Sequence, residues 1–254
     1  MRITFLGTGT SCGVPMLGCR CSVCKSSDSR DKRTRCSLLV ETLSTRILID
    51  CGPDFRQQMM DKEFRRIDGL LVTHAHYDHI GGIDDLRPYC KLGRIKVYAD
   101  CTASESMLRT LPYCFHKEKY PGVPDIQLET ISPHALFDVG DITIQPFIVM
   151  HGDLPILGYR MGRFAYITDM KTIDDKELDY LKGIDTLIVN ALRFENPHHS
   201  HQLVDEAIAF SKRTGAKRTF IIHLSHHIGL HEEVNIVLPE GFELAYDGQI
   251  VDID

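Results

Sequence analysis

The chain has 254 residues, of which 43% are hydrophobic and 25% charged, and its formal net charge is −6 with histidine neutral. This composition is typical of a globular protein with a sizeable core, and it lacks the basic footprint that nucleic-acid binding usually shows. No apolar run approaches the roughly 20 residues of a membrane span, and no signal peptide is visible before the first strand-like run. We therefore expect a cytoplasmic protein that does not enter a membrane.

Apolar, strand-like runs recur along the chain, and many are continuous, which suits strands covered on a face by helices. We predict strands over Ile3–Leu6, Ser37–Glu41, Arg46–Asp50, Gly69–Thr73, Lys96–Ala99, Ile142–Val149, Phe164–Thr168, Thr186–Val189 and Thr219–His223. We predict helices over Asp54–Arg65, Thr102–Leu111, Thr172–Leu181 and Leu203–Thr214. The mixture predicts one α/β domain over residues 1–254.

Two segments differ from this pattern. Residues 112–135 contain four prolines, with Tyr113, Phe115 and Tyr120 among them, so we expect a long loop. Such a loop is either a wall or lid of the site or a surface connection. Near the end, Phe242–Ala245 and Gln249–Ile253 flank Asp247 and Gly248, a turn signal that predicts a hairpin.

Four residues of metal-ligand type follow the strand-like run Gly69–Thr73, namely His74, His76, Asp78 and His79. Because side chains at i and i+2 of a strand share a face, His74 and His76 can point the same way. If the chain then turns into a helix, Asp78 and His79 can reach an adjacent point. One short segment could thus serve two metals about 3.5–4 Å apart. Imidazole and carboxylate together suit zinc, manganese or iron.

The order His-x-His-x-Asp-His after an apolar strand resembles the signature of metallo-β-lactamase-fold hydrolases. The resemblance covers nearly the whole chain and implies an αββα sandwich, in which two mixed sheets are flanked by helices. Further ligands of this family follow other strands. Three residues of ligand type fit that expectation at strand ends: His151, Asp169 and His223.

Residue by residue, the resemblance implies a pair of metal sites. One metal would be held by His74, His76 and His151. The other would be held by Asp78, His79 and His223. Asp169 would bridge both, and Asp78 would count among the catalytic groups as well as the ligands. Asp50, in Leu-Ile-Asp-Cys-Gly, would support catalysis by orienting a histidine ligand, and its alternative role is that of a strand-end turn residue.

A second cluster of ligand type is Cys19-x-Cys21-x2-Cys24, where three close thiolates favour zinc. A closed structural site needs a fourth ligand, and His226 is the candidate. Together with the preceding Gly-Thr-Gly-Thr-Ser and Gly-Val-Pro motifs, this knuckle resembles the phosphoribosyl cyclic phosphate phosphodiesterase family of the phosphonate pathway. In that group, such cysteines and such a histidine hold a structural zinc.

The segment His198-His199-Ser200-His201 precedes a helix-like stretch and resembles the place of an additional family histidine. That histidine helps to bind phosphate or to protonate the leaving group, and His201 fits it best, with His199 second. An ordinary histidine pKa of about 6.5 suits general acid work near neutrality. The alternative is a solvated helix start. Arg87 could contact an anionic substrate, or form an ion pair.

These features predict a binuclear metal-dependent phosphodiesterase that acts on small cyclic or linear phosphodiesters. Its cofactors would be two active-site divalent metals, zinc or manganese, and one structural zinc. The alternatives are a ribonuclease of the tRNA 3′-processing type and a non-catalytic metal-binding scaffold. A long RNA-gripping arm would lie between His151 and Asp169, where only residues 152–168 intervene. The resemblance also implies a homodimer, although the sequence defines no interface for one.

Overall fold

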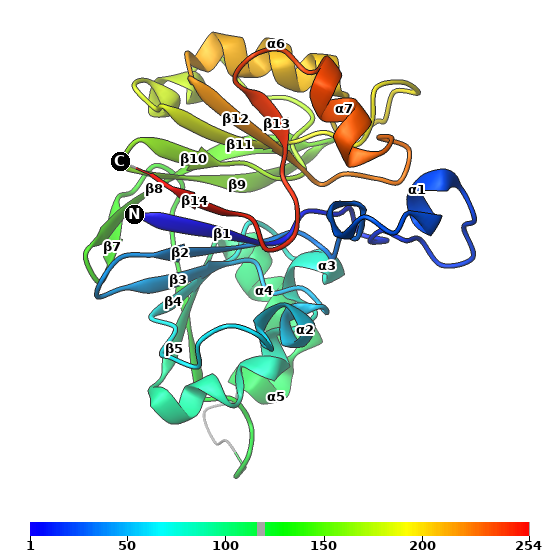
Figure 1. Cartoon of the computed structure of the whole chain (residues 1–254). Coiled ribbons are helices and arrows are strands. Elements are labelled where there is room, and N and C mark those ends of the chain that lie inside the picture. Colours follow the sequence, from blue (N-terminus) through cyan, green and yellow to red (C-terminus); the bar gives the residue numbers. More distant parts are fainter. Residues whose placement is uncertain (116–119, 254) are drawn as a thin grey trace.

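The computed structural model describes residues 1–115 and 120–253. Two seven-stranded sheets pack face to face, and helices cover the outer face of each (Figure 1). This is the αββα sandwich with two mixed sheets that the sequence led us to expect, and that fold is therefore confirmed.

The first sheet has the strand order β14-β1-β2-β3-β4-β5-β6. Its strands are β1 (Arg2–Gly7), β2 (Ser37–Glu41), β3 (Arg46–Ile49), β4 (Gly69–Leu71), β5 (Ile95–Ala99), β6 (Ile126–Thr130) and β14 (Ile250–Asp252). The pairs from β14 to β3 are antiparallel, and those from β3 to β6 are parallel.

The second sheet has the order β13-β12-β11-β10-β9-β8-β7. Its strands are β7 (Phe137–Val139), β8 (Ile142–His151), β9 (Leu154–Met161), β10 (Phe164–Tyr166), β11 (Thr186–Asn190), β12 (Arg218–Ile222) and β13 (Phe242–Leu244). The pairs from β7 to β10 are antiparallel, and those from β10 to β13 are parallel.

The α-helices are short except for two. They are α1 (Ser22–Lys25), α2 (Phe55–Met59), α3 (Tyr77–Ile80), α4 (Cys101–Thr110), α5 (Pro112–Phe115), α6 (Val204–Thr214) and α7 (His231–Val237). Local capping residues fix the start of α4 and the end of α6. The carboxylate of Asp100 caps α4 by accepting from Ala103 N at 2.7 Å. Helix α6 ends at Gly215, whose φ of 75° is in the left-handed region that glycine adopts freely.

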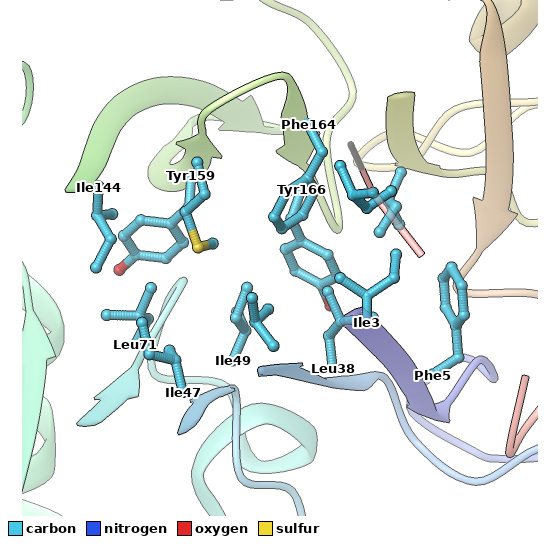
Figure 2. Packing of buried hydrophobic residues seen from close by; sticks show 14 of the residues in the cluster. Ile3, Phe5, Leu38, Ile47, Ile49, Leu71, Ile144, Tyr159, Phe164 and Tyr166 are labelled. Atoms are coloured by element: carbon cyan, nitrogen blue, oxygen red, sulfur yellow. The ribbon is translucent and has the colours of Figure 1, made fainter. Parts of the chain in front are cut away.

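The core has three layers because the sheet strands are buried on both faces. Alternate side chains of each strand point inward between the sheets, where Leu38, Ile47 and Tyr166 meet others of the cluster in Figure 2. Their neighbours along the strands, such as Leu48 and Ile221, pack outward under the helices. The sequence therefore reads as continuous apolar runs rather than an alternating pattern.

All the strands that we predicted before residue 240 are present, with bounds that differ by at most two residues, and β6, β7 and β9 were missed. The predicted C-terminal hairpin is wrong. Although Asp247 and Gly248 do form a turn, β13 pairs with β12 and β14 pairs with β1, so the two strands enter different sheets. The carboxylate of Asp247 accepts from the Thr8 and Thr34 backbone amides, at 2.9 and 2.6 Å, and so ties this crossing segment to the first sheet.

Two predicted helices are also largely wrong. The predicted Asp54–Arg65 stops at Met59, since the carbonyls of Glu63 and Arg65 turn to accept from the Arg46 guanidinium. Of the predicted Thr172–Leu181, only Glu177–Leu181 is helical, as a 3-10 turn. Thr172, the first residue of the predicted helix, instead forms an isolated β-bridge with Met150 next to the site.

Residues 112–135 are not one long loop, since they contain α5 and the edge strand β6. Of this segment, residues 116–119 lie outside the described part. None of its described residues lines the cavity beside the histidine cluster, so a lid there gains no support. Gly122 O accepts from Arg87, which also forms an ion pair with Asp84 at 2.6 Å. The ion-pair role of Arg87 is therefore the one seen. In the described part, no helix has the length and apolar character needed to cross a bilayer.

Candidate metal centre

The predicted ligands come from four strand ends, and the supporting Asp50 comes from a fifth; all five meet at one edge of the sandwich. His74, His76, Asp78 and His79 follow β4, and His79 lies in α3. The other ligands come from the second sheet: His151 closes β8, and Asp169 and His223 follow β10 and β12. Asp50 follows β3. Short loops after strands that are anchored in two sheets thus hold side chains from distant parts of the sequence close together.

The backbone turns sharply at three of these positions. Among the described residues, five non-glycine residues have positive φ, and they include Asp50 (57°), Asp169 (56°) and His223 (58°). Asp, Asn and His are the side chains that tolerate this left-handed region best. Because such conformations cost free energy, they persist where the surrounding structure holds them, commonly at functional sites. Each of these strands thus ends abruptly, and the polar side chain that follows it is directed into the site.

One set of facing ligand atoms belongs to His74, His76, His151 and Asp169, all within 4.8 Å of one another. His74 Nε2 and His76 Nδ1 face each other at 2.9 Å. The nearest oxygen of Asp169 lies 3.9 Å from His74 Nε2. Three imidazoles and a carboxylate match the ligand preferences of zinc and of related divalent metals.

The second set contains Asp78, His79, His223 and again Asp169. Asp169 Oδ1 lies 3.5 Å from His79 Nε2 and 3.2 Å from His223 Nε2, so its two oxygens face the two sets. The Nε2 atoms of His79 and His223 are fully buried and take part in no hydrogen bond within the described residues. Because buried polar atoms are normally satisfied, these orphaned nitrogens fit a bound metal ion.

Hydrogen bonds behind the ligands fix their orientation. Asp50 Oδ2 lies 2.7 Å from His79 Nδ1, and the Thr73 backbone N–H donates to Asp50 Oδ1 at 2.8 Å. On the other side, His151 Nδ1 lies 2.9 Å from the carbonyl oxygen of Ser200. These contacts leave the Nε2 atoms of both histidines directed at the site. Thr73 and Ser200 escaped the sequence analysis, since a threonine after a strand and a backbone carbonyl carry no recognisable signal.

The electrostatics separate the two buried aspartates. Burial opposes ionisation of Asp169, but the nearby His223 and His79 hold its pKa well below the usual range. Burial raises the pKa of Asp50, although His79 and Thr73 partly oppose the rise. Burial also lowers the pKa of His74, with the neighbouring His79 adding to it. Burial opposes a charge on His79, but Asp169 and Asp50 raise its pKa well above the usual value. The site therefore favours an ionised Asp169, and His79 would have to release a proton when a metal binds.

His201 is brought to the centre, and His199 is not. The His201 ring lies 4.7 Å from that of His223 and 4.6 Å from that of His151, and its Nδ1 lies 4.0 Å from Asp169. Burial, followed by the proximity of His223, lowers the pKa of His201 to about 3. His199 is exposed and packs on His198 instead. His201 thus faces the ligand sets as a neutral hydrogen-bonding group.

The three cysteines of the knuckle converge with His226, as their ligand atoms lie within 4.8 Å of one another. The sulfurs of Cys19 and Cys21 each lie 3.4 Å from His226 Nδ1. The Cys24 backbone N–H and His226 lower the pKa of Cys21 to about 6, whereas burial raises that of Cys24 to about 11. Four ligand atoms of sulfur and nitrogen fit a closed tetrahedral zinc site.

Comparison with known proteins places this geometry in context. Residues 45–224 match the model of the beta-lactamase superfamily domain. The crystal structure of a new diphosphatase from the PhnP family superimposes with a TM-score of 0.92 at 35% identity, over 100% of this chain and 98% of that one.

Curated relatives add two more names. An octanoyltransferase of Porphyromonas gingivalis is 46% identical over 255 residues, which is all of this chain but 52% of that protein. Ribonuclease Z of Bradyrhizobium sp. is 32% identical over 133 residues, covering 50% of this chain and 44% of the relative. The chain thus spans about half the length of the curated relatives it matches.

Proposed function

Because the chain belongs to the beta-lactamase superfamily and, within it, to the PhnP family, we propose that it is a binuclear metal-dependent phosphodiesterase. The observation that carries the proposal is the position of Asp169, whose oxygens face both ligand sets. A carboxylate shared between two sets of imidazoles suits a pair of ions, which is a common arrangement for phosphoryl chemistry. When bound, such ions supply a nucleophilic hydroxide near neutral pH and neutralise charge on the phosphoryl group.

The chain's own residues hold and polarise the reacting groups. Asp50 fixes the ring of His79, and the Ser200 carbonyl fixes that of His151, so that neither ligand needs to reorganise during turnover. His201 is close enough to the ligand sets to reach a bound phosphate or its leaving oxygen. As a neutral imidazole it would donate a hydrogen bond from one ring nitrogen. Asp78 would serve as ligand and as a fixed negative charge beside His223.

We propose small cyclic or linear phosphodiesters, or diphosphates, as the substrates. The name of the PhnP-family relative, a diphosphatase, and the acidic net charge support this choice over RNA. The interval between His151 and Asp169 consists of the two sheet strands β9 and β10 and short connections, so it holds no arm that could grip a tRNA. A ribonuclease without that arm is the second candidate, favoured by the likeness to ribonuclease Z.

The name octanoyltransferase describes a protein of which this chain matches about half. The ligand sets supply no observation that favours acyl transfer, so we do not propose it for this chain. Zinc in the knuckle, zinc or manganese in the binuclear site, a homodimer and a cytoplasmic location also remain part of the proposal.

The proposal is tested by a substrate panel on protein of measured metal content. The panel contains bis(p-nitrophenyl) phosphate, ribose cyclic phosphates, a dinucleoside diphosphate and a precursor tRNA. We expect metal-dependent cleavage of the small compounds, and loss of that activity in the His76→Ala variant. Cleavage of the precursor tRNA alone would favour the ribonuclease. If wild type and His76→Ala behave alike on every compound, the catalytic proposal is wrong.

A further inference from the structure

Asn190 is a polar side chain at the end of β11, where its neighbours Val189 and Ala191 are apolar and it is itself fully buried. Both groups of its amide bind a single residue. Asn190 Oδ1 accepts from Met170 N at 2.7 Å, and Nδ2 donates to Met170 O at 2.9 Å. Met170 directly follows Asp169 in the chain. We propose that Asn190 is a positioning residue, which holds the carboxylate of Asp169 between the two ligand sets before any metal binds. This inference rests on the proposed binuclear function.

The Asn190 amide binds the chain just past the point where β10 and β11 stop pairing through their backbones. Beyond the paired residues, Ile167 N still donates to Ile188 O at 2.9 Å, and the chain then turns at Asp169 with a φ of 56°. Such a conformation costs free energy and persists only where neighbouring contacts hold it. Because Asn190 binds both backbone groups of the next residue, it fixes the position at which the turn ends.

The segment that follows this turn is also bound on its other edge. Met150 O accepts from Lys171 N at 2.7 Å, and Met150 N donates to Thr172 O at 2.9 Å. Met150 immediately precedes His151, a proposed ligand of the first set. The segment is therefore bonded both to the side chain of Asn190 and to the strand end that carries His151.

Asn190 is joined to a third ligand through its own strand. It lies opposite Ile222 in the register of β11 and β12, and Ala191 N donates to Ile222 O at 2.9 Å. Ile222 immediately precedes His223, a proposed ligand of the second set. A change at Asn190 should therefore disturb ligands of both sets, and Asp169, which the two sets share, most directly.

The alternative role of Asn190 is to satisfy two buried backbone groups, as buried polar side chains commonly do. Asn235 in α7 serves as the example of such a role. Its amide also makes two contacts, accepting from Leu244 N at 2.8 Å and meeting His231 Nε2 at 2.9 Å. Neither contact involves a residue of the two ligand sets or its chain neighbour. If Asn190 has no more than this role, substitution of either asparagine should affect stability alone.

The test compares Asn190→Leu with the matched control Asn235→Leu. Equilibrium dialysis against manganese, followed by elemental analysis, measures the free metal concentration at which the active site is half loaded, and counts knuckle zinc in the same sample. We expect Asn190→Leu to need about tenfold to a hundredfold more manganese than wild type, the usual effect of removing a group that orients a ligand. Its knuckle zinc should be unchanged, and Asn235→Leu should load like wild type.

Kinetics on bis(p-nitrophenyl) phosphate give a second reading of the same variants. Because Asn190 is buried behind the ligands and touches no substrate, its loss should lower kcat and leave KM nearly unchanged. A folded Asn190→Leu variant that loads manganese and turns over like wild type would overturn the inference.

Amide hydrogen exchange of the wild type decides the question even if Asn190→Leu does not fold. In protein stripped of its active-site metals, we expect the Met170 N–H to exchange as slowly as in the metal-loaded protein, as measured by nuclear magnetic resonance. Protection that arises only when manganese is added would mean that the metal, and not Asn190, sets the turn, and would overturn the inference. Metal loading and exchange need no substrate, so a wild type that binds two metals but cleaves no phosphodiester would contradict the proposed function alone.

Discussion

The two sheets of the sandwich are built alike. In each, three antiparallel pairings are followed by three parallel ones, so β3 of the first sheet corresponds to β10 of the second, and β5 corresponds to β12. Asp50 and Asp169 follow these equivalent strands β3 and β10, with φ of 57° and 56°. The same backbone device therefore presents an aspartate to the site from both sides.

The carboxylates of the two aspartates have different neighbours. Asp50 is completely buried, and its oxygens are taken by Thr73 and by His79 Nδ1. Asp169 has Thr168 on one oxygen and otherwise faces open ligand nitrogens. A difference in neighbours, rather than in backbone, would make one a support and the other a ligand of the proposed metal pair. The comparison teaches that equivalent positions in the two sheets need not have equivalent chemistry.

The substitution Asp169→Asn gives the strongest test of the difference between the two aspartates. Because the amide removes a charge that both ligand sets share, we expect activity to fall by far more than the roughly hundredfold typical of supporting residues. The active-site metal content should fall with it, while knuckle zinc remains. Elemental analysis and steady-state kinetics on bis(p-nitrophenyl) phosphate measure both. A variant that keeps two active-site metals and most of its activity would show that Asp169 bridges nothing.

The matched change in the other sheet is Asp50→Asn. Since Asp50 acts through His79, we expect a loss of about tenfold to a hundredfold in activity or metal affinity, smaller than for Asp169→Asn. Metal titration of the variant should show weakened binding at one of the two sites. Circular dichroism serves as the control for folding. If Asp50→Asn equals or exceeds Asp169→Asn in its effect on turnover, the distinction between support and ligand is wrong.

The comparison also explains what could be read from the sequence. The first sheet supplies its ligands in one run, His74 to His79, which a periodic pattern reveals directly. The second would supply them singly, at His151, Asp169 and His223, and the family resemblance pointed to these residues because each follows an apolar strand. Thr73 and the Ser200 carbonyl could not be found, because their roles depend on contacts across the fold.

The elements that were predicted wrongly from the sequence have a similar explanation. The Asp247–Gly248 turn has the sequence of a hairpin, and local chemistry cannot tell that the two strands enter different sheets. Helix length after Asp54 was overestimated because the Arg46 guanidinium, from a neighbouring strand, binds the carbonyls of the continuation. Strand β9 is joined to the segment before His74 by a backbone hydrogen bond, which Leu157 N donates to Thr73 O at 3.0 Å. These are tertiary contacts that override local propensity.

The knuckle offers a contrast with both aspartates, because its three cysteines and His226 would form a closed ligand set. Cys24→Ser removes a buried ligand, and we expect the zinc to be lost and the free energy of unfolding to fall by about 2 kcal/mol. That corresponds to a melting temperature lower by about 4–8 °C. Turnover per bound active-site metal pair should change little. Differential scanning calorimetry with elemental analysis checks this, and an unaltered melting temperature in zinc-free variant protein would contradict it.

An effect on stability that depends on pH is expected where α7 meets the N-terminal segment. His231 is buried against Arg33 at 3.2 Å, with Asp31 accepting from its backbone N–H. Burial, then Arg33 and Arg30, lowers its pKa to about 4, below the usual 6.5 of an unfolded chain. The unfolded state therefore binds the extra proton first. Stability contributed by this group is present above pH 6.5 and is lost as the pH falls toward 4.

His231→Gln should remove that dependence. Between pH 6.5 and 4 we expect the free energy of unfolding of the wild type to fall by about 1–3 kcal/mol more than that of the variant. Urea denaturation at a series of pH values gives both curves, and Asn235→Ala, which loses the contact to His231 Nε2 but keeps the imidazole, is the control. Parallel curves for wild type and His231→Gln would show that this histidine does not titrate with unfolding.

The left-handed turns at positions 50, 169 and 223 restrict how this site can decay over evolutionary time. A β-branched or bulky side chain is a genuine outlier at such φ values, so loss of one of these three side chains would tend to leave Asn or Gly rather than Val or Leu. A descendant that had abandoned metal chemistry would therefore keep the backbone of the site and show those small or amide residues. Its sequence would record the lost function at three fixed places.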